Sequence, residues 1–500
     1  MARLAIGTDP EMIRLIAARW RAAGFATVRE AAEGGIALAV AEKRVRPVTN
    51  LRREEGGDWT AAVGTWFRDG EPAGAEALAA LARDFDARGA AARDRLIGHF
   101  SAAFRRGGRV TVVCDGLASH FLHYGQDERG RALVSTSLLD FAFLFPGPWF
   151  GEAEDVLSSA VFGHAGMDGT TAVPGVGRLL GPERLVLRTA PGGAEAPALT
   201  VERAPGPCTG PAPGGTMAEA LGRFRALSDR AFAGLGRYPL VGVHATGGLD
   251  SRLIVANAMR HRLPVQLRYG VGNSALTNTK AADLEAARAL ARATGWPLRV
   301  MDWSGGEMRP RAERERLLFE HGLLLSYGGA SGFLAELAGG SDPFPDILVG
   351  GQNPAFLNLG RPWEMDRLPR SAGEIARLVS ARPAASARDP EAFRRAVARQ
   401  VTRHLERHLP GADPEALAPE EGSETLIRLR SGREAVILNF YNEFYPYLAP
   451  YFTTELFAFL LSLLAAWRRD DHFQIAAIDD AAPAMLDVPV FSGTVRRRVD

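Results

Sequence analysis

The chain has 500 residues, a formal net charge of +1 and two cysteines. This length predicts two or more domains, each large enough to bury its own core. The nearly neutral charge argues against nucleic acid or an anionic membrane as a partner. Two cysteines provide neither a disulfide framework nor a zinc site. Because Arg3, Asp9 and Glu11 interrupt any early apolar run, we expect no signal peptide and a cytoplasmic protein.

Short strand-like runs and amphipathic helices alternate through the first 203 residues. We expect a helix at 75–87 and strands at 109–114, 132–135 and 185–188. The segment 204–215 is dense in proline and glycine, which predicts a linker. The expected domains are therefore 1–203 and 216–500, joined by that linker.

The second half alternates strands with helices, which predicts a parallel α/β sheet with a helical end from about residue 391. The expected strands lie at 240–245, 264–269, 298–303 and 346–350. The most apolar stretch, 452–467, is short for a membrane span and contains Glu455. We interpret it as a buried helix and expect no membrane association.

The most informative segment is a strand, a tight turn and a helix at 240–260. Its turn contains Thr246, Gly247, Gly248, Asp250 and Ser251. Backbone N–H groups and hydroxyls at the start of a helix suit a phosphate group. The Asp250 carboxylate is the kind of ligand that magnesium prefers. The alternative is a purely structural turn that needs two glycines for tightness.

This turn, Thr-Gly-Gly-Leu-Asp-Ser, resembles the SGGxDS pyrophosphate loop of the asparagine synthetase family. Further segments are similar to family motifs, in the family's order: 96–104, 115–124, 135–139 and 170–181 in the first half, with 446–448 near the end. The resemblance implies two domains, an N-terminal amidotransferase-like αββα domain of the Ntn type and a C-terminal parallel-sheet adenylating synthetase domain. It also implies ATP and Mg²⁺ as cofactors.

The chain departs from the family at the amidotransferase nucleophile. Glutamine-hydrolysing members have Cys at position 2, where the thiol and the free α-amino group act together; here position 2 is Ala2, and Cys114 belongs to a core strand. We therefore expect no glutamine hydrolysis. In this respect the first domain resembles the amidotransferase-like domains of lasso-peptide cyclases and β-lactam synthetases, which do not hydrolyse glutamine.

The second departure lies in the synthetase half. Gly350 and Gly351 match the family's second glycine loop, but Gln352 and Asn353 replace its acids. The family's late lysine is absent, since Lys280 is the last lysine of the chain. A cation in its place could come from arginines near the end of the chain, namely Arg468, Arg469 or the cluster 496–498. Arginine, however, does not replace lysine as a point charge.

Three other motifs compete with this interpretation. No Gly-Lys-Ser/Thr P-loop is present, and the segment 270–275 matches a dinucleotide fingerprint only weakly because its helix and acid come late. His404 and His408 have the i, i+4 spacing of metal ligands, but the charged residues around them favour a solvated helix.

The resemblance implies an AMP-forming amide-bond ligase that adenylates a carboxylate and joins it to an amine. Thr246, Gly247, Gly248, Ser251 and the adjacent Arg252 are expected to hold the phosphates, together with Gly350 and Gly351, and Asp250 to hold the metal. We name Glu443 and Tyr269 as candidate general bases, while Asp283 either reaches the nucleotide or lies on a helix surface. The implied partners are a small-molecule or peptide carboxylate and a precursor peptide or partner protein. The alternative is a degenerate paralogue that binds a nucleotide or a partner without turnover.

Overall fold

The computed structural model describes residues 2–25, 27–43, 47–145, 169–171, 173–188, 198–203, 215–271, 277–302, 344–352, 369–385, 389–409, 411–463, 467 and 471–489. These residues form a mixed α/β fold with two antiparallel sheets and one parallel sheet. Of the expected linker, only Gly215 is described. No helix in these ranges is long and apolar enough to cross a membrane.

The first antiparallel sheet has the strand order β11-β9-β10-β1-β3-β2, and the second has the order β13-β12-β8-β7-β5-β4, with β6 paired to β5. The strands of the first are β1 (Arg3–Gly7), β2 (Val28–Glu33), β3 (Ile36–Ala41), β9 (His123–Gln126), β10 (Ala132–Ser135) and β11 (Val176–Arg178). Those of the second are β4 (Leu51–Arg53), β5 (Trp59–Arg68), β6 (Glu71–Pro72), β7 (Leu96–Arg106), β8 (Arg109–Cys114), β12 (Glu183–Arg188) and β13 (Ala198–Arg203).

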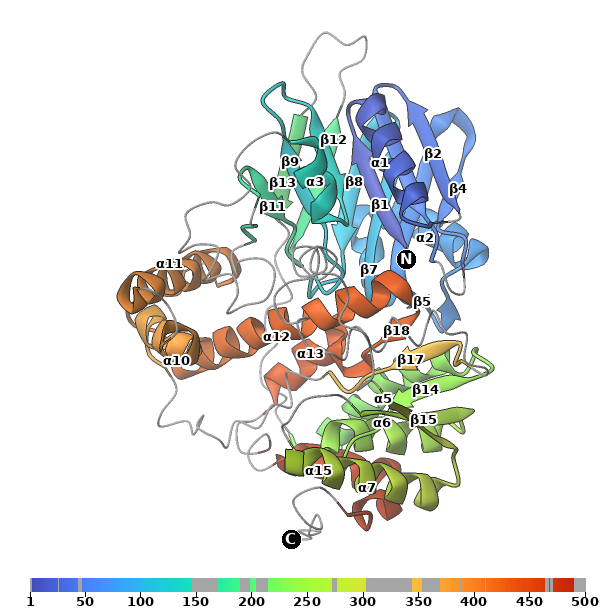
Figure 1. Cartoon of the computed structure of the whole chain (residues 1–500), viewed down its shortest axis with the longest axis vertical. Helices are drawn as coiled ribbons and strands as arrows, with labels where there is room; N and C mark the ends of the chain where they lie inside the picture. The colour runs from blue at the N-terminus through green and yellow to red at the C-terminus, as the bar shows by residue number, and fades with distance from the viewer. Residues whose placement is uncertain are drawn as a thin grey trace.

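The two sheets stack into a sandwich because their side chains alternate between faces. In β3, Leu38 and Val40 pack with Val63 of the facing sheet, whereas Ala37 and Ala39 belong to the cluster beneath α1 (Pro10–Ala22). The short helix α3 (Leu138–Leu144) lies beside β10 and packs in the same cluster as α1, whereas α2 (Ala75–Arg88) packs on β5 at the other face. The result is a helix–sheet–sheet–helix arrangement, visible in the upper part of Figure 1.

The parallel sheet has the order β16-β15-β14-β17-β18. Its strands are β14 (Val241–His244), β15 (Val265–Val271), β16 (Leu298–Asp302), β17 (Ile347–Val349) and β18 (Tyr447–Leu448). The helices are α5 (Met217–Leu235), α6 (Leu249–Arg260), α7 (Thr277–Thr294), α10 (Ala372–Ala385), α11 (Pro390–His408), α12 (Pro419–Phe444), α13 (Thr454–Ser462) and α15 (His472–Ala481). The four expected strands and the parallel pairing are therefore confirmed; β18 was not predicted.

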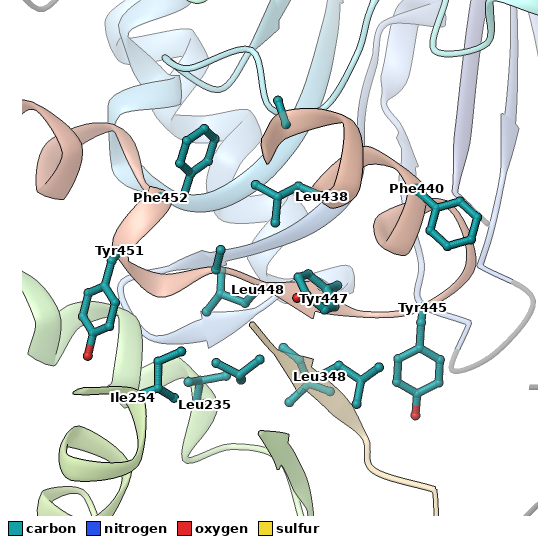
Figure 2. Packing of buried hydrophobic residues seen from close by; sticks show 14 of the residues in the cluster. Leu235, Ile254, Leu348, Leu438, Phe440, Tyr445, Tyr447, Leu448, Tyr451 and Phe452 are labelled. Carbon is teal, nitrogen blue, oxygen red and sulfur yellow. The ribbon is translucent and has the colours of Figure 1, made fainter. Parts of the chain in front are cut away.

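The strand β18 joins the parallel sheet to the sandwich. Its aromatic and aliphatic side chains lie in one apolar cluster with residues from α5, α6 and β17 (Figure 2). The long helix α12, which precedes β18, contacts β5 and β7 of the sandwich. The two parts of the fold therefore share a continuous core.

Side chains of the sandwich also bond to the backbone around β18. The Tyr447 N–H donates to Thr65 Oγ1 at 3.0 Å, and the Ala449 N–H donates to His99 Nε2 at 3.0 Å. Lys43 Nζ donates to the Tyr445 carbonyl oxygen at 3.2 Å. Within the described part of the chain β18 has a strand neighbour on one side, and these side chains bond to the backbone along its other edge.

Candidate functional site

The turn after β14 lies at the point where the strand order of the parallel sheet reverses. From β14 the chain builds outward through β15 and β16, and then returns to the other side of β14 with β17. In open α/β sheets, ligands bind at the carboxyl ends of the strands at such a switch point. The turn 245–248 and the residues after β17 lie at this switch point.

The turn is held in shape by Ser251. Its buried hydroxyl accepts the Thr246 N–H at 3.1 Å and lies 3.2 Å from the Gly248 carbonyl oxygen, to which it donates. Thr246 itself is exposed. Ser251 therefore shapes the turn together with the Thr246 hydroxyl, whose Oγ1 lies 3.0 Å from Ser251 Oγ and accepts the Gly248 N–H at 3.3 Å.

The helix α6 begins directly at this turn. Its N-cap residue, Gly248, has no side chain to accept the first N–H groups of the helix. Those N–H groups, together with the helix dipole, make the start of a helix favourable for an anion. Asp250 lies in this first turn, where its Oδ1 accepts a hydrogen bond from Gln474 Nε2 of α15 at 2.7 Å.

Asp283 reaches the turn from α7. Its Oδ1 accepts the Gly247 N–H at 2.8 Å. Asp283 therefore contacts the turn, and its contact with a nucleotide stays a prediction. A carboxylate already bonds to one of the N–H groups that we expected to bind phosphate.

The two glycine turns lie against each other. A Cβ added at Gly351 would lie 3.4 Å from both the Cβ of Asp250 and the backbone nitrogen of Ser251. A Cβ at Gly350 would lie 1.7 Å from the Tyr447 hydroxyl oxygen and 2.1 Å from Gln352 Oε1, so no side chain fits there. Gly351 therefore lies against the 246–251 turn, while phosphate binding by Gly350 and Gly351 stays a prediction.

Arg252 does not lie where a phosphate ligand would. Its buried guanidinium donates to the carbonyl oxygens of Met485, Val488 and Pro489 at 2.8, 2.5 and 2.9 Å. Burial lowers the pKa of Arg252 to about 10, which still leaves it charged at neutral pH. The expectation that Arg252 binds phosphate is therefore corrected: it holds segment 485–489 against α6.

The two candidate general bases have different surroundings. Glu443 is buried and paired with Arg3 Nη2 at 2.7 Å, so its charge is balanced by the sandwich. Burial, and then the charge of Asp283, raises the pKa of Tyr269, which keeps its phenol protonated at neutral pH. Tyr269 is thus suited to donate a hydrogen bond near Asp283, and the assignment of a base remains a prediction.

Three residues near the switch point were not predicted. The His244 ring, at the end of β14, has its centroid 5.8 Å from that of Tyr441 and 5.9 Å from that of Tyr447. Burial lowers the pKa of His244 to about 4, with Arg268 contributing, so it is neutral at pH 7. The Tyr447 hydroxyl donates to Gln352 Oε1 at 2.8 Å. The sequence could have indicated His244, because it ends the strand directly before the glycine turn. It could not have indicated Tyr447 or Gln474, because both come from segments that are distant in the sequence.

Magnesium is compatible with this chemistry but not with a cage made by the protein. Among the described residues, no three His, Cys, Asp or Glu side chains come together as a metal site. Magnesium commonly uses one or two carboxylates plus substrate phosphates and water. Asp250 suits that role, and Gln352 can add a neutral oxygen.

Comparisons with known proteins leave the family open. No protein-family profile matches the chain, and no curated protein matches it. Among solved structures, NMN synthetase from Francisella tularensis has 16% identity and a TM-score of 0.21, covering 29% of this chain and 59% of its own. The chain therefore spans little more than half of that protein.

Two longer matches have equally low similarity. The allosteric regulatory enzyme of purine biosynthesis has 12% identity and a TM-score of 0.24, covering 63% of this chain and 70% of its own. Glutamine phosphoribosylpyrophosphate amidotransferase from B. subtilis, in complex with ADP and GMP, has 12% identity and a TM-score of 0.23, covering 79% of each chain. Since the TM-scores are this low, functional inference rests on the geometry of the chain itself.

Proposed function

We propose that the protein is an ATP-dependent, AMP-forming ligase that adenylates a carboxylate and joins it to an amine. The observation that supports this most strongly is the position of the 246–251 turn. It lies at the switch point of a parallel sheet, at the start of α6, with a second glycine turn packed against it. Such a place suits the β and γ phosphates of ATP.

Each residue of the turn has a distinct part in this proposal. Thr246 and the first N–H groups of α6 bind the pyrophosphate portion, while Ser251 maintains the shape of the turn. Asp250 would hold Mg²⁺, which when bound screens the charge that builds up on the leaving pyrophosphate. Gln474 orients the Asp250 carboxylate through its 2.7 Å hydrogen bond.

The reaction begins when a substrate carboxylate oxygen attacks the α-phosphorus. The bond between the α-phosphorus and the bridging oxygen breaks, and pyrophosphate leaves with the electron pair. An amine then attacks the acyl carbon of the acyl-adenylate, and AMP leaves as the amine loses a proton to a general base. We propose a peptide or small-molecule carboxylate as substrate and the cytoplasm as the location.

We also propose that the sandwich is an amidotransferase-like αββα domain that no longer hydrolyses glutamine. Position 2 is a buried alanine, and Cys114 is fully buried in β8. Burial raises the pKa of the Cys114 thiol, which suppresses the reactive thiolate. The amine would then come from a substrate, and the sandwich would serve to support β18.

The experiment is an assay of nucleotide products with Mg²⁺ and a set of candidate carboxylates and amines. We expect AMP and pyrophosphate in equal amounts, with loss of both in Asp250→Asn. Asp479→Asn, at an exposed position of α15, is the matched control and should keep wild-type rates. ADP as the main product would reject the proposal.

A second candidate, a paralogue that binds nucleotide without turnover, has one observation in its favour. The residue after the second glycine turn, Gln352, is neutral and already accepts a hydrogen bond from Tyr447. Under this alternative, ATP binds but neither AMP nor ADP forms with any substrate. Saturable ATP binding without products would therefore favour it over the ligase.

A further inference from the structure

A small hollow lies where the sandwich meets α11 and α12, apart from the residues of the 246–251 turn. It has a volume of about 60 Å³, and its polar lining includes Arg178, His404, His408 and Arg428. Two glycines allow the backbone to form the sandwich side: a Cβ on Gly181 would lie 1.8 Å from the Gly116 carbonyl oxygen. We call this hollow the Arg178 pocket.

The side chains of the Arg178 pocket are held by their neighbours. Arg178 lies over the Phe121 ring, with its guanidinium carbon 4.7 Å from the ring centroid. Arg428 is paired with Glu424 through Nε and Nη2, at 2.7 and 2.6 Å. Both guanidinium groups are therefore partly positioned before any ligand arrives.

The expectation that His404 and His408 lie on a solvated helix is wrong. His404 is buried, His408 is partly buried, and their ring centroids are 4.2 Å apart. Burial is the main cause that lowers the pKa of His408, followed by His404, Arg428, Arg407 and Arg203. Each of these neighbours disfavours a further positive charge, so the i, i+4 histidine pair is poorly suited to a metal cation.

No acidic residue is among the described residues that line the pocket, and three acids that are close in sequence to lining residues each have a described partner. Glu183 is paired with Arg407 at 2.6 Å, and Glu424 with Arg428. Asp115 accepts the backbone N–H groups of Leu117, Ser119 and His120. The carboxylates are thus engaged at the edges of the pocket, where they hold the arginines and the loop in place.

We infer that the Arg178 pocket binds a compact oxyanion, namely a phosphate group that is either free or esterified. Arginine forks and imidazole N–H groups are the donors that phosphate recognition uses. A cavity needs about 10–15 Å³ of such volume to hold one water molecule, so the hollow has room for a compact group the size of a few waters. The inference does not depend on the proposed ligase activity.

The test is calorimetric titration of the full-length protein with inorganic phosphate and, separately, with methyl phosphate. We expect saturable binding that falls roughly tenfold in Arg428→Gln, because one charge-assisted contact is lost. Arg395→Gln, at an exposed position of the same helix as His408, is the matched control and should bind like wild type. Binding of methyl phosphate identifies an ester as the source, and binding of inorganic phosphate alone identifies the free ion.

A second variant guards against misfolding, since Arg428→Gln leaves Glu424 unpaired. His408→Gln removes no described ion pair and should weaken binding while ATP binding stays intact. The inference is overturned by an absence of saturable binding, or by equal affinity in wild type, Arg428→Gln and His408→Gln.

Discussion

Thr65→Val should disturb the edge of β18 without changing the size of the side chain. Thr65 is buried, and its Oγ1 lies 2.7 Å from Lys43 Nζ and 2.5 Å from Asn442 Oδ1 while accepting the Tyr447 N–H at 3.0 Å. Valine replaces this hydroxyl with a methyl group. The Tyr447 N–H and the Asn442 oxygen then lose a partner in a buried place.

The expected cost follows from those two groups. The Tyr447 N–H is left unsatisfied in a buried place, whereas Asn442 Oδ1 keeps Lys43 Nζ at 3.5 Å. A buried polar group left unsatisfied costs about 1–3 kcal/mol, so the free energy of unfolding should fall by about that amount. Lys43 loses one of its acceptors but keeps the Tyr445 carbonyl oxygen. Because Tyr447 also bonds to Gln352 beside the glycine turn, AMP formation should fall as well.

Urea unfolding and the rate of AMP formation measure the two effects. The matched control is Thr111→Val, on β8, which is also buried and whose hydroxyl makes no hydrogen bond in the described part of the chain. That variant should lose less than about 1 kcal/mol. If Thr65→Val were as stable and as active as Thr111→Val, the support of β18 by the sandwich would be refuted.

Three further predictions concern pH, the turn and the C-terminal segment. Burial is the main cause that lowers the pKa of His99 to about 3, so the stability that its neutral ring contributes should be lost as the pH falls below about 6.5, by at most about 1.4 kcal/mol per pH unit for this one group. His99→Gln should therefore reduce the slope of stability against pH in urea unfolding measured from pH 7 to 5. Gly350→Ala should displace Tyr447 and lower AMP formation at least about tenfold in a product assay, whereas Gly351→Ala, whose nearest contact is 3.4 Å, should keep most of it; equal rates would contradict the packing. In Arg252→Met, the free energy of unfolding should fall by about 3 kcal/mol or more, measured by thermal unfolding, because three carbonyl groups lose their donor. The ratio of AMP to ADP should stay unchanged. A switch to ADP would show that Arg252 is a phosphate ligand after all.

The parts of the fold that local pattern determines could be predicted from the sequence. The apolar run at 240–243 and the helical pattern from Leu253 gave β14 and α6, because the hydrophobic period changes across the glycine turn. The strands at 109–114 and 132–135 were found with the same boundaries in the structure. These elements depend on neighbouring residues alone.

Contacts between distant segments could not be predicted. Glu443 lies 440 positions from Arg3, its ion-pair partner, and no local pattern indicates that pairing. The strand β18 has two residues, too few to show an alternation, and it depends on the sandwich for its hydrogen bonds. Similarly, the charged residues around His404 in the sequence predicted a solvent-exposed side chain. His404 is buried because residues of the sandwich and of α12, which are distant in the sequence, lie around it.

The position of bound nucleotide is the most direct test of the proposed site. The analogue α,β-methylene ATP cannot be cleaved between its α and β phosphorus atoms. A crystal structure of the protein with this analogue and Mg²⁺ would therefore show where each phosphate lies. We expect the β and γ phosphates at the turn 246–251 and the start of α6, with the metal beside Asp250. Nucleotide bound elsewhere, with this turn unliganded, would contradict the assignment of the switch point as the ATP site.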